Sequence, residues 1–169
     1  MSFVPVPVER PGGGRVADKT PPAPADIVVV DGYERSVPLH RLAAAAWAEL
    51  TAAARTDGHA APLFLPVSGY RTVEEQAWLW QGALAKYGDP EVACLWVARP
   101  GTSAHQSGRA VDCHLGDPIE SEYAHVMRDT AAYRWLVAHA ELFGFYPYEV
   151  EPWHWEYNPP WDVSGGAGE

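Results

Sequence analysis

Helix caps and glycine stops divide this chain into short segments, and this feature constrains its fold more than any other. Thr72 and Glu75 form a capping box, which predicts a helix that runs to about Tyr87 and ends at Gly88. Apolar periodicity and capping residues predict three further helical segments: residues 38–56, a short helix that begins at Asp89-Pro90, and a helix from Thr130 to Gly144.

Short apolar runs between these helices have the composition and length of β-strands. They lie at residues 27–30, 63–67, 110–114 and 153–157. Because helices and strands are interspersed without regular parallel crossovers, the sequence predicts an α+β fold with a small antiparallel sheet flanked by helices.

The two ends of the chain differ in composition from the part between them. Residues 1–26 are rich in proline and contain the run Gly12-Gly13-Gly14, which favours an extended arm. Residues 164–169 are small and glycine-rich and are expected to form a flexible tail. A single domain is therefore predicted over residues 27–163.

Charge and composition disfavour several classes of partner and site. The chain has 12 Lys+Arg against 22 Asp+Glu, a formal net charge of −10, which disfavours nucleic acid as a partner. Its apolar runs are far shorter than the ~20 residues of a membrane-spanning helix. No signal peptide is visible in the first residues, so the sequence as written predicts a cytoplasmic protein. We also expect a monomer.

Cys94 and Cys113 are too few for a disulfide framework or an all-thiolate zinc site. They either pair once with each other or stay reduced.

A glycine-flanked stretch places an imidazole and a carboxylate seven residues apart, His105 in a loop and Asp112 on a predicted strand. A catalytic zinc ion takes three protein ligands with nitrogen or oxygen donors and keeps one position open. Since one loop rarely wraps a metal alone, we expect a second histidine from elsewhere in the chain, and His154 is the candidate. His114 shares a strand face with Asp112 and is an alternative ligand, or an outer hydrogen-bond partner of one.

The segment around His154 also supplies candidates for a catalytic base. On a strand, His154 and Glu156 share one face, and the aromatic residues at 153, 155 and 157 share the other. Glu151 lies at the start of this strand, where a carboxylate can take the proton of a zinc-bound water. Glu149 and Glu156 are the rival carboxylates for this role.

Three motifs, in this order, resemble those of the VanY/VanX family of zinc D-Ala-D-Ala peptidases. They are Ser68-Gly69-Tyr70-Arg71, Ser103-x-His105-x-x-Gly108-x-Ala110-x-Asp112, and Glu151-Pro152-Trp153-His154. The resemblance implies that His105, Asp112 and His154 bind zinc in a cleft on the sheet and that Glu151 is the catalytic base. It also implies that Arg71 stabilises the developing oxyanion or holds the substrate.

Two further residues are candidates for substrate contact. Ser103 matches the serine of the second motif, and Gln76 lies one turn into the helix that follows Arg71. The residues of the first and third motifs favour the VanY-like carboxypeptidase branch, although phage endolysin peptidases share the same motifs.

The sequence therefore predicts a zinc-dependent carboxypeptidase that hydrolyses D-Ala-D-Ala or related stem peptides of peptidoglycan or its precursors. One alternative is a peptidoglycan endopeptidase of the same family. Another is a non-catalytic zinc-binding module that recognises a peptide. A structural zinc ion usually has four protein ligands, so His114 or a cysteine as a fourth ligand would favour that module.

Overall fold

The computed structural model describes residues 13–161 and 163 of the 169-residue chain. The first twelve residues of the predicted arm and the predicted tail at residues 164–169 lie outside the described residues. The described helices are η1 (Pro24–Asp26), α2 (Arg41–Thr56), α3 (Val73–Tyr87), α4 (Pro90–Trp96), η2 (Ala104–Ser107), η3 (Ser121–Tyr123), α5 (Ala124–Arg128), α6 (Ala131–His139) and η4 (Ala140–Phe143). The described strands are β1 (Ile27–Asp31), β2 (Ser36–His40), β3 (Pro66–Ser68), β4 (Ala110–Cys113), β5 (Phe145–Tyr148) and β6 (Glu151–Tyr157).

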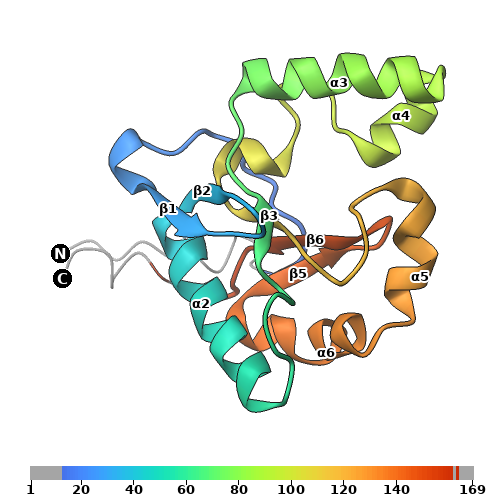
Figure 1. The fold of residues 1–169 in the computed structure, drawn as a ribbon. Coiled ribbons are helices and arrows are strands. Elements are labelled where there is room, and N and C mark those ends of the chain that lie inside the picture. The colour runs from blue at the N-terminus through green and yellow to red at the C-terminus, as the bar shows by residue number, and fades with distance from the viewer. Residues whose placement is uncertain (1–12, 162, 164–169) are drawn as a thin grey trace, which may run out of the picture.

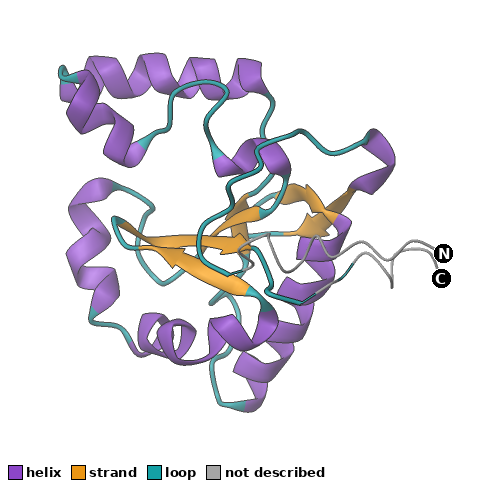
Figure 2. Cartoon of the chain, turned by 180° about the vertical axis from the view of Figure 1, so that it is seen from behind, coloured by secondary structure: helices purple, strands orange, loops and turns teal. Residues whose placement is uncertain are grey.

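The described strands form two antiparallel sheets. β1 and β2 form a hairpin, and the larger sheet has the order β3-β4-β6-β5. Figures 1 and 2 place α3 and α4 on the opposite side of the larger sheet from α2 and α6. The predicted α+β class, with a small antiparallel sheet flanked by helices, is confirmed.

Several predicted elements have different bounds in the structure. The helix expected from residue 38 begins only at Arg41, because residues 36–40 pair with β1 and His40 caps the helix, its Nδ1 accepting a hydrogen bond from the Leu42 amide at 3.1 Å. The strand expected over 63–67 is shifted to Pro66–Ser68. Phe64 has a positive φ of 70°, a conformation that a strand does not tolerate.

The hydrophobic core lies between the larger sheet and α2 and α6. Trp155 and Tyr157 of β6 are buried there, and the ring of Trp47 on α2 packs edge-on against Phe145 of β5. The indole of Trp47 donates to the carbonyl oxygen of Phe64 at 2.9 Å, so its polar atom is satisfied inside the core. Trp155 and Tyr157 are thus fixed in the core, and the alternate residues His154 and Glu156 point away from them.

Two glycines allow the loops that carry the motifs to approach β2 closely. A Cβ on Gly69 would lie 2.2 Å from the carbonyl oxygen of Pro38, a distance that no side chain can occupy. Gly108 has a φ of +75°, and a Cβ there would lie 3.0 Å from the amide of His40. The amide of Arg71 also donates to the carbonyl oxygen of His105 at 3.1 Å, which joins the first two motifs directly.

No described helix combines the length and the apolar character that crossing a bilayer requires.

Candidate metal centre

Three side chains from different elements converge at one point beside the larger sheet. His105 comes from η2, Asp112 from β4 and His154 from β6, and Asp112 and His154 are directly opposite each other in the β4–β6 register. One nitrogen or oxygen atom from each lies within 4.8 Å of the others, and all three residues are buried. The structure therefore brings together the three residues that the sequence singled out as metal ligands.

Hydrogen bonds on the outer side of each imidazole fix which nitrogen faces the centre. Nδ1 of His105 lies 2.7 Å from the carbonyl oxygen of Gly69, and Nε2 of His154 lies 2.7 Å from Oε2 of Glu156. Both partners are acceptors, so each of these outer ring nitrogens can carry the proton of its neutral imidazole. Nε2 of His105 and Nδ1 of His154 then present their lone pairs toward Asp112, as metal ligation requires.

The electrostatics of the group favour a positive charge at its centre. Burial opposes ionisation of Asp112, yet the adjacent His105 and His154 hold the pKa of this carboxyl well below its usual value. Burial also opposes protonation of His154, but its hydrogen bonds to Asp112 and Glu156 outweigh this effect and raise its pKa to about 10. A divalent cation supplies the positive charge that such a cluster stabilises.

This donor set fits a catalytic zinc ion better than a structural one. Two imidazoles and one carboxylate are the ligands that zinc takes in catalytic sites, where one position stays open. Among the described residues the group has only these three members. His114, the alternative ligand, instead stacks on the ring of Tyr33 at a centroid distance of 3.9 Å, and both cysteines are free thiols outside the group.

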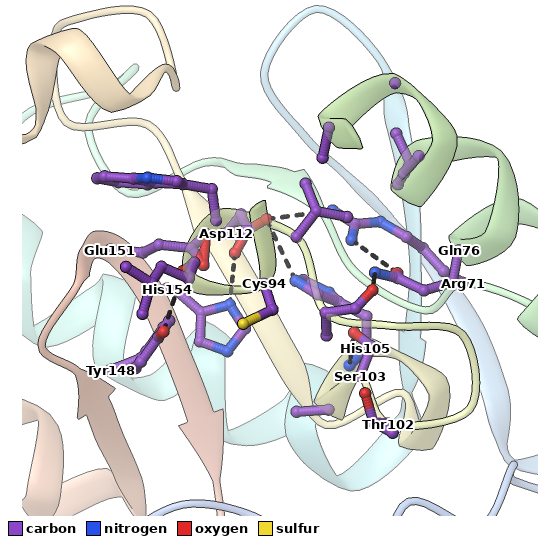
Figure 3. A pocket seen from close by; sticks show the side chains of 18 of the residues that line it. Arg71, Gln76, Cys94, Thr102, Ser103, His105, Asp112, Tyr148, Glu151 and His154 are labelled. Atoms are coloured by element: carbon purple, nitrogen blue, oxygen red, sulfur yellow. Dashed lines mark hydrogen bonds and ion pairs between the residues drawn. The ribbon is translucent and has the colours of Figure 1, made fainter. Parts of the chain in front are cut away.

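The group opens into a cavity of about 680 Å³ between the larger sheet and the α3–α4 pair. All seven site residues expected from the sequence line this cavity: Arg71, Gln76, Ser103, His105, Asp112, Glu151 and His154. Figure 3 shows Glu151 and His154 on one side of Asp112, and Arg71, Gln76 and His105 on the other. The cavity also has aromatic walls, among them Trp96 and Trp153.

Of the three carboxylates considered for the base, Glu151 is the one that lines this cavity. Its Oε1 accepts a hydrogen bond from the indole of Trp153 at 3.0 Å. Burial raises the pKa of Glu151 to about 7, a value suited to accepting and releasing a proton near neutral pH. Of the two rivals, Glu149 is exposed and Glu156 is buried behind His154.

Arg71 is held at the edge of the metal group by three side chains. Its Nη2 donates to Ser68 Oγ at 2.9 Å and to Asp112 Oδ2 at 3.3 Å, and its Nη1 donates to Gln76 Oε1 at 3.2 Å. Gln76 is only 2% exposed, and its amide nitrogen donates to the carbonyl oxygen of Ala98 at 2.8 Å. These contacts give Gln76 a role in holding Arg71 as well as a place in the cavity wall.

Ser103 lies at the start of the short helix that carries His105. Its hydroxyl accepts the amide hydrogen of His105 at 3.2 Å, so it caps that helix, and the residue also lines the cavity. Ser103 can therefore cap the helix and also contact a molecule bound in the cavity.

The structure also brings residues to the site that the sequence reasoning missed. Arg15 and Lys19 line the same cavity, although they belong to the segment predicted as an arm, and Tyr148 of β5 lines it as well. Local sequence carried no signal for the two basic residues, because their contacts with the site are long-range. Glu156 was named from the sequence as a rival base on the strand face of His154, but its hydrogen bond with Nε2 of His154 was not predicted.

A comparison with protein families matches residues 36–160 to the family model VanY, described as D-alanyl-D-alanine carboxypeptidase. Among curated proteins, the chain is 38% identical over 130 residues to a D-alanyl-D-alanine carboxypeptidase of Enterococcus faecalis, covering 64% of this chain and 44% of that protein. It is 34% identical over 103 residues to the bifunctional D-Ala-D-Ala dipeptidase and D-Ala-D-Ala carboxypeptidase VanXYC of Enterococcus gallinarum, covering 54% of each. The chain thus spans about half the length of these curated relatives.

Solved structures show the same similarity. The LdcB LD-carboxypeptidase superposes with a TM-score of 0.65 at 28% identity, covering 81% of this chain and 70% of that one. VanYB in complex with D-alanine-D-alanine superposes with a TM-score of 0.59 at 31% identity, covering 82% and 81%. A mutant of the vancomycin-resistance D,D-pentapeptidase VanY from a VanB-type resistance cassette, in complex with Zn(II), superposes with a TM-score of 0.57 at 32% identity, covering 82% of each chain.

Proposed function

The chain belongs to the VanY family of D-alanyl-D-alanine carboxypeptidases, and from this premise we propose that it is a zinc peptidase that hydrolyses D-Ala-D-Ala or related stem peptides of peptidoglycan or of its precursors. The family resemblance predicted from the three motifs is confirmed. The observation that carries the proposal is the buried His105–Asp112–His154 group, which opens into a cavity that also contains Glu151 and Arg71.

The proposed zinc ligands are Nε2 of His105, a carboxylate oxygen of Asp112 and Nδ1 of His154. Zinc, when bound, supplies Lewis acidity that lowers the pKa of a water toward ~7 and polarises the scissile carbonyl. Support for zinc comes from the donor set described above and from the Zn(II) complex of a relative with 32% identity.

Glu151 is the proposed general base. Its carboxylate faces the cavity beside the metal ligands, and its pKa, raised to about 7 by burial, allows it to accept the proton of the attacking water. The same carboxyl then donates this proton to the leaving amine. The hydrogen bond from Trp153 holds one carboxylate oxygen, and this fixes the direction of the side chain.

Arg71 is proposed to offset the negative charge that develops on the carbonyl oxygen, or to hold the terminal carboxylate of the substrate. A guanidinium presents several donors in one plane, which suits both roles. Its contacts with Ser68, Gln76 and Asp112 restrict its rotamers, so the donors are positioned before substrate binds. Ser103 and Gln76 are the further residues proposed to line the substrate subsite.

The second candidate is an L,D specificity, in which the protein cleaves the peptide bond between an L-residue and the D-residue that follows it. It is favoured by the similarity to the LdcB LD-carboxypeptidase at a TM-score of 0.65. The endopeptidase alternative stays a prediction, and so do the monomeric state, the cytoplasmic location and the domain bounds. Among the described residues the metal group has three members rather than four, which argues against the purely structural zinc module.

Fragment analysis tests the proposed function. The zinc-loaded protein is incubated with a pentapeptide ending in D-Ala-D-Ala and, separately, with a tetrapeptide ending in a single D-Ala, and the products are identified by mass. Release of one D-Ala from the pentapeptide supports the D,D-carboxypeptidase, and release of D-Ala from the tetrapeptide supports the L,D specificity. Cleavage of purified cell walls without release of D-Ala from either peptide supports the endopeptidase, and no hydrolysis of any substrate rejects the proposed enzyme.

A further inference from the structure

Glu156 is a completely buried carboxylate behind the metal group that the proposed chemistry does not use. Its side chain is 0% exposed and lies two residues from His154 on the same face of β6. Oε2 of Glu156 lies 2.7 Å from Nε2 of His154, and Oε1 accepts the amide hydrogen of Val16 at 2.7 Å. A buried carboxylate is costly unless it is paired and hydrogen-bonded, so such complete pairing indicates a built arrangement.

Arg15 supplies the charge that balances Glu156. Its Nε and Nη2 donate to Glu156 Oε2 at 3.0 and 2.6 Å, although the two residues are 141 positions apart in the sequence. The guanidinium carbon also lies 4.0 Å from the centroid of the Tyr148 ring, which places the cation over an aromatic face. The Arg15 side chain is 50% exposed, whereas its carboxylate partner is inaccessible.

The backbone around Arg15 is anchored to the elements that carry the metal group. The amide of Gly13 donates to the carbonyl oxygen of Asn158, just after β6, at 2.7 Å. Val16 is buried against Ala104, which directly precedes His105 on η2, and against Ala110, which lies two residues before Asp112 on β4. The segment of residues 13–16 is therefore seated between the elements that position all three ligands.

From this geometry we propose that Glu156 is a positioning residue that keeps His154 in the tautomer and orientation needed for metal ligation, and that Arg15 holds Glu156 in that place. The inference rests on the zinc site of the proposed function. It does not depend on which peptide bond is cleaved.

The physical reason lies in the two acceptors that compete for the single proton of neutral His154. Oδ1 of Asp112 lies 2.8 Å from Nδ1, and Oε2 of Glu156 lies 2.7 Å from Nε2. A proton on Nδ1 would satisfy Asp112 but would remove the lone pair that the metal needs. Glu156 stabilises the alternative, in which Nε2 carries the proton and Nδ1 is free. Loss of such an outer partner typically lowers metal affinity by about 10–100-fold, and we expect a loss of the same order for Glu156.

Zinc affinity measured by competition with a chelating indicator tests the inference. We expect Glu156→Leu to weaken zinc binding by about 10–100-fold. Glu156→Gln keeps a neutral acceptor for the Nε2 proton, so its loss should be smaller. Arg15→Gln leaves Glu156 without its charged partner and should also weaken binding, less than Glu156→Leu does. Arg41→Gln is the matched control, because Arg41 pairs with Asp26 at the surface and does not line the cavity.

A second measurement separates positioning of the ligand from mere stabilisation of the fold. Cobalt(II) replaces zinc, and the visible absorption bands report the geometry of the ligands. The inference predicts altered bands in both Glu156 variants and in Arg15→Gln, and wild-type bands in Arg41→Gln. Should Glu156→Leu fail to fold, Glu156→Gln and the half-exposed Arg15→Gln decide the matter by the same two readouts.

Three outcomes decide between the two proposals. Weaker zinc binding with altered cobalt bands in the Glu156 and Arg15 variants supports the inference. Wild-type zinc affinity and cobalt bands in these variants, with only a lowered melting temperature, overturn it and leave the proposed function standing. Absence of zinc binding in the wild-type protein overturns both.

Discussion

Replacing Glu151 by Gln should separate catalysis from metal binding. The amide oxygen can still accept the hydrogen bond that Trp153 donates at 3.0 Å, so the side chain keeps its place. It has no basic oxygen to accept a proton, and loss of a general base typically costs ~10²–10⁴ in turnover. At ~1.4 kcal/mol per factor of ten, this raises the activation barrier by ~3–5 kcal/mol. Zinc content should stay at the wild-type level.

The same change should stabilise the metal-free chain at alkaline pH. Burial raises the pKa of Glu151 from 4.5 to about 7. Between these two values the unfolded chain has released a proton that the folded chain retains, so wild-type stability falls as the pH rises. At ~1.4 kcal/mol per pKa unit, the loss is complete above pH ~7 and amounts to ~3 kcal/mol. Gln does not titrate and avoids this loss.

The assay combines turnover, metal content and urea unfolding after chelation at pH 5.5 and pH 8. Relative to wild type, Glu151→Gln should gain ~2 kcal/mol more at pH 8 than at pH 5.5. Glu149→Gln is the control, because Glu149 is exposed two residues away and should change neither turnover nor stability appreciably. Wild-type turnover in Glu151→Gln would refute its role as the base, and an equal effect at the two pH values would refute the raised pKa.

Three further predictions concern the proposed ligands, Arg71 and the packing of the first motif. His154→Ala should deplete zinc in the purified protein, because it removes one of the three proposed ligands; wild-type metal content by elemental analysis would contradict this. Arg71→Gln should lower kcat/KM of the zinc-loaded protein by ~10²-fold or more, since it removes charged donors from the cavity; an unchanged kcat/KM would count against its role. Gly69→Ala should destabilise the fold by about 3 kcal/mol or more, because its Cβ would lie 2.2 Å from a backbone oxygen. Its control is Gly82→Ala on α3, where the new Cβ has open space and the change should be neutral or stabilising by up to ~1 kcal/mol. Thermal unfolding compares the two, and equal melting temperatures would contradict the close packing of Gly69.

Local sequence signals located the helices well where caps were present. The Thr72–Glu75 capping box and the Gly88 stop bound α3 in the structure as predicted, and Asp89-Pro90 opens α4. The strands β2 and β5 were missed because each contains a proline, Pro38 and Pro147, a residue type that is depleted in strands.

The site residues also differ in whether the local sequence or only a long-range contact identifies them. His105, Asp112 and His154 were recognisable because each lies in a short motif whose spacing fits its element. Arg15 was not recognisable, because its contact with Glu156 joins a proline- and glycine-rich segment to a strand 141 positions away. Such a contact is determined by how the chain packs and not by the residues on either side of Arg15.

The most direct test of the metal centre is a crystal structure of the zinc-loaded protein with anomalous data at the zinc absorption edge. We expect one strong peak at ~2.0–2.2 Å from Nε2 of His105, an oxygen of Asp112 and Nδ1 of His154, with the remaining position facing the cavity. A peak elsewhere, or a fourth protein ligand that closes the site, would contradict the proposed metal centre.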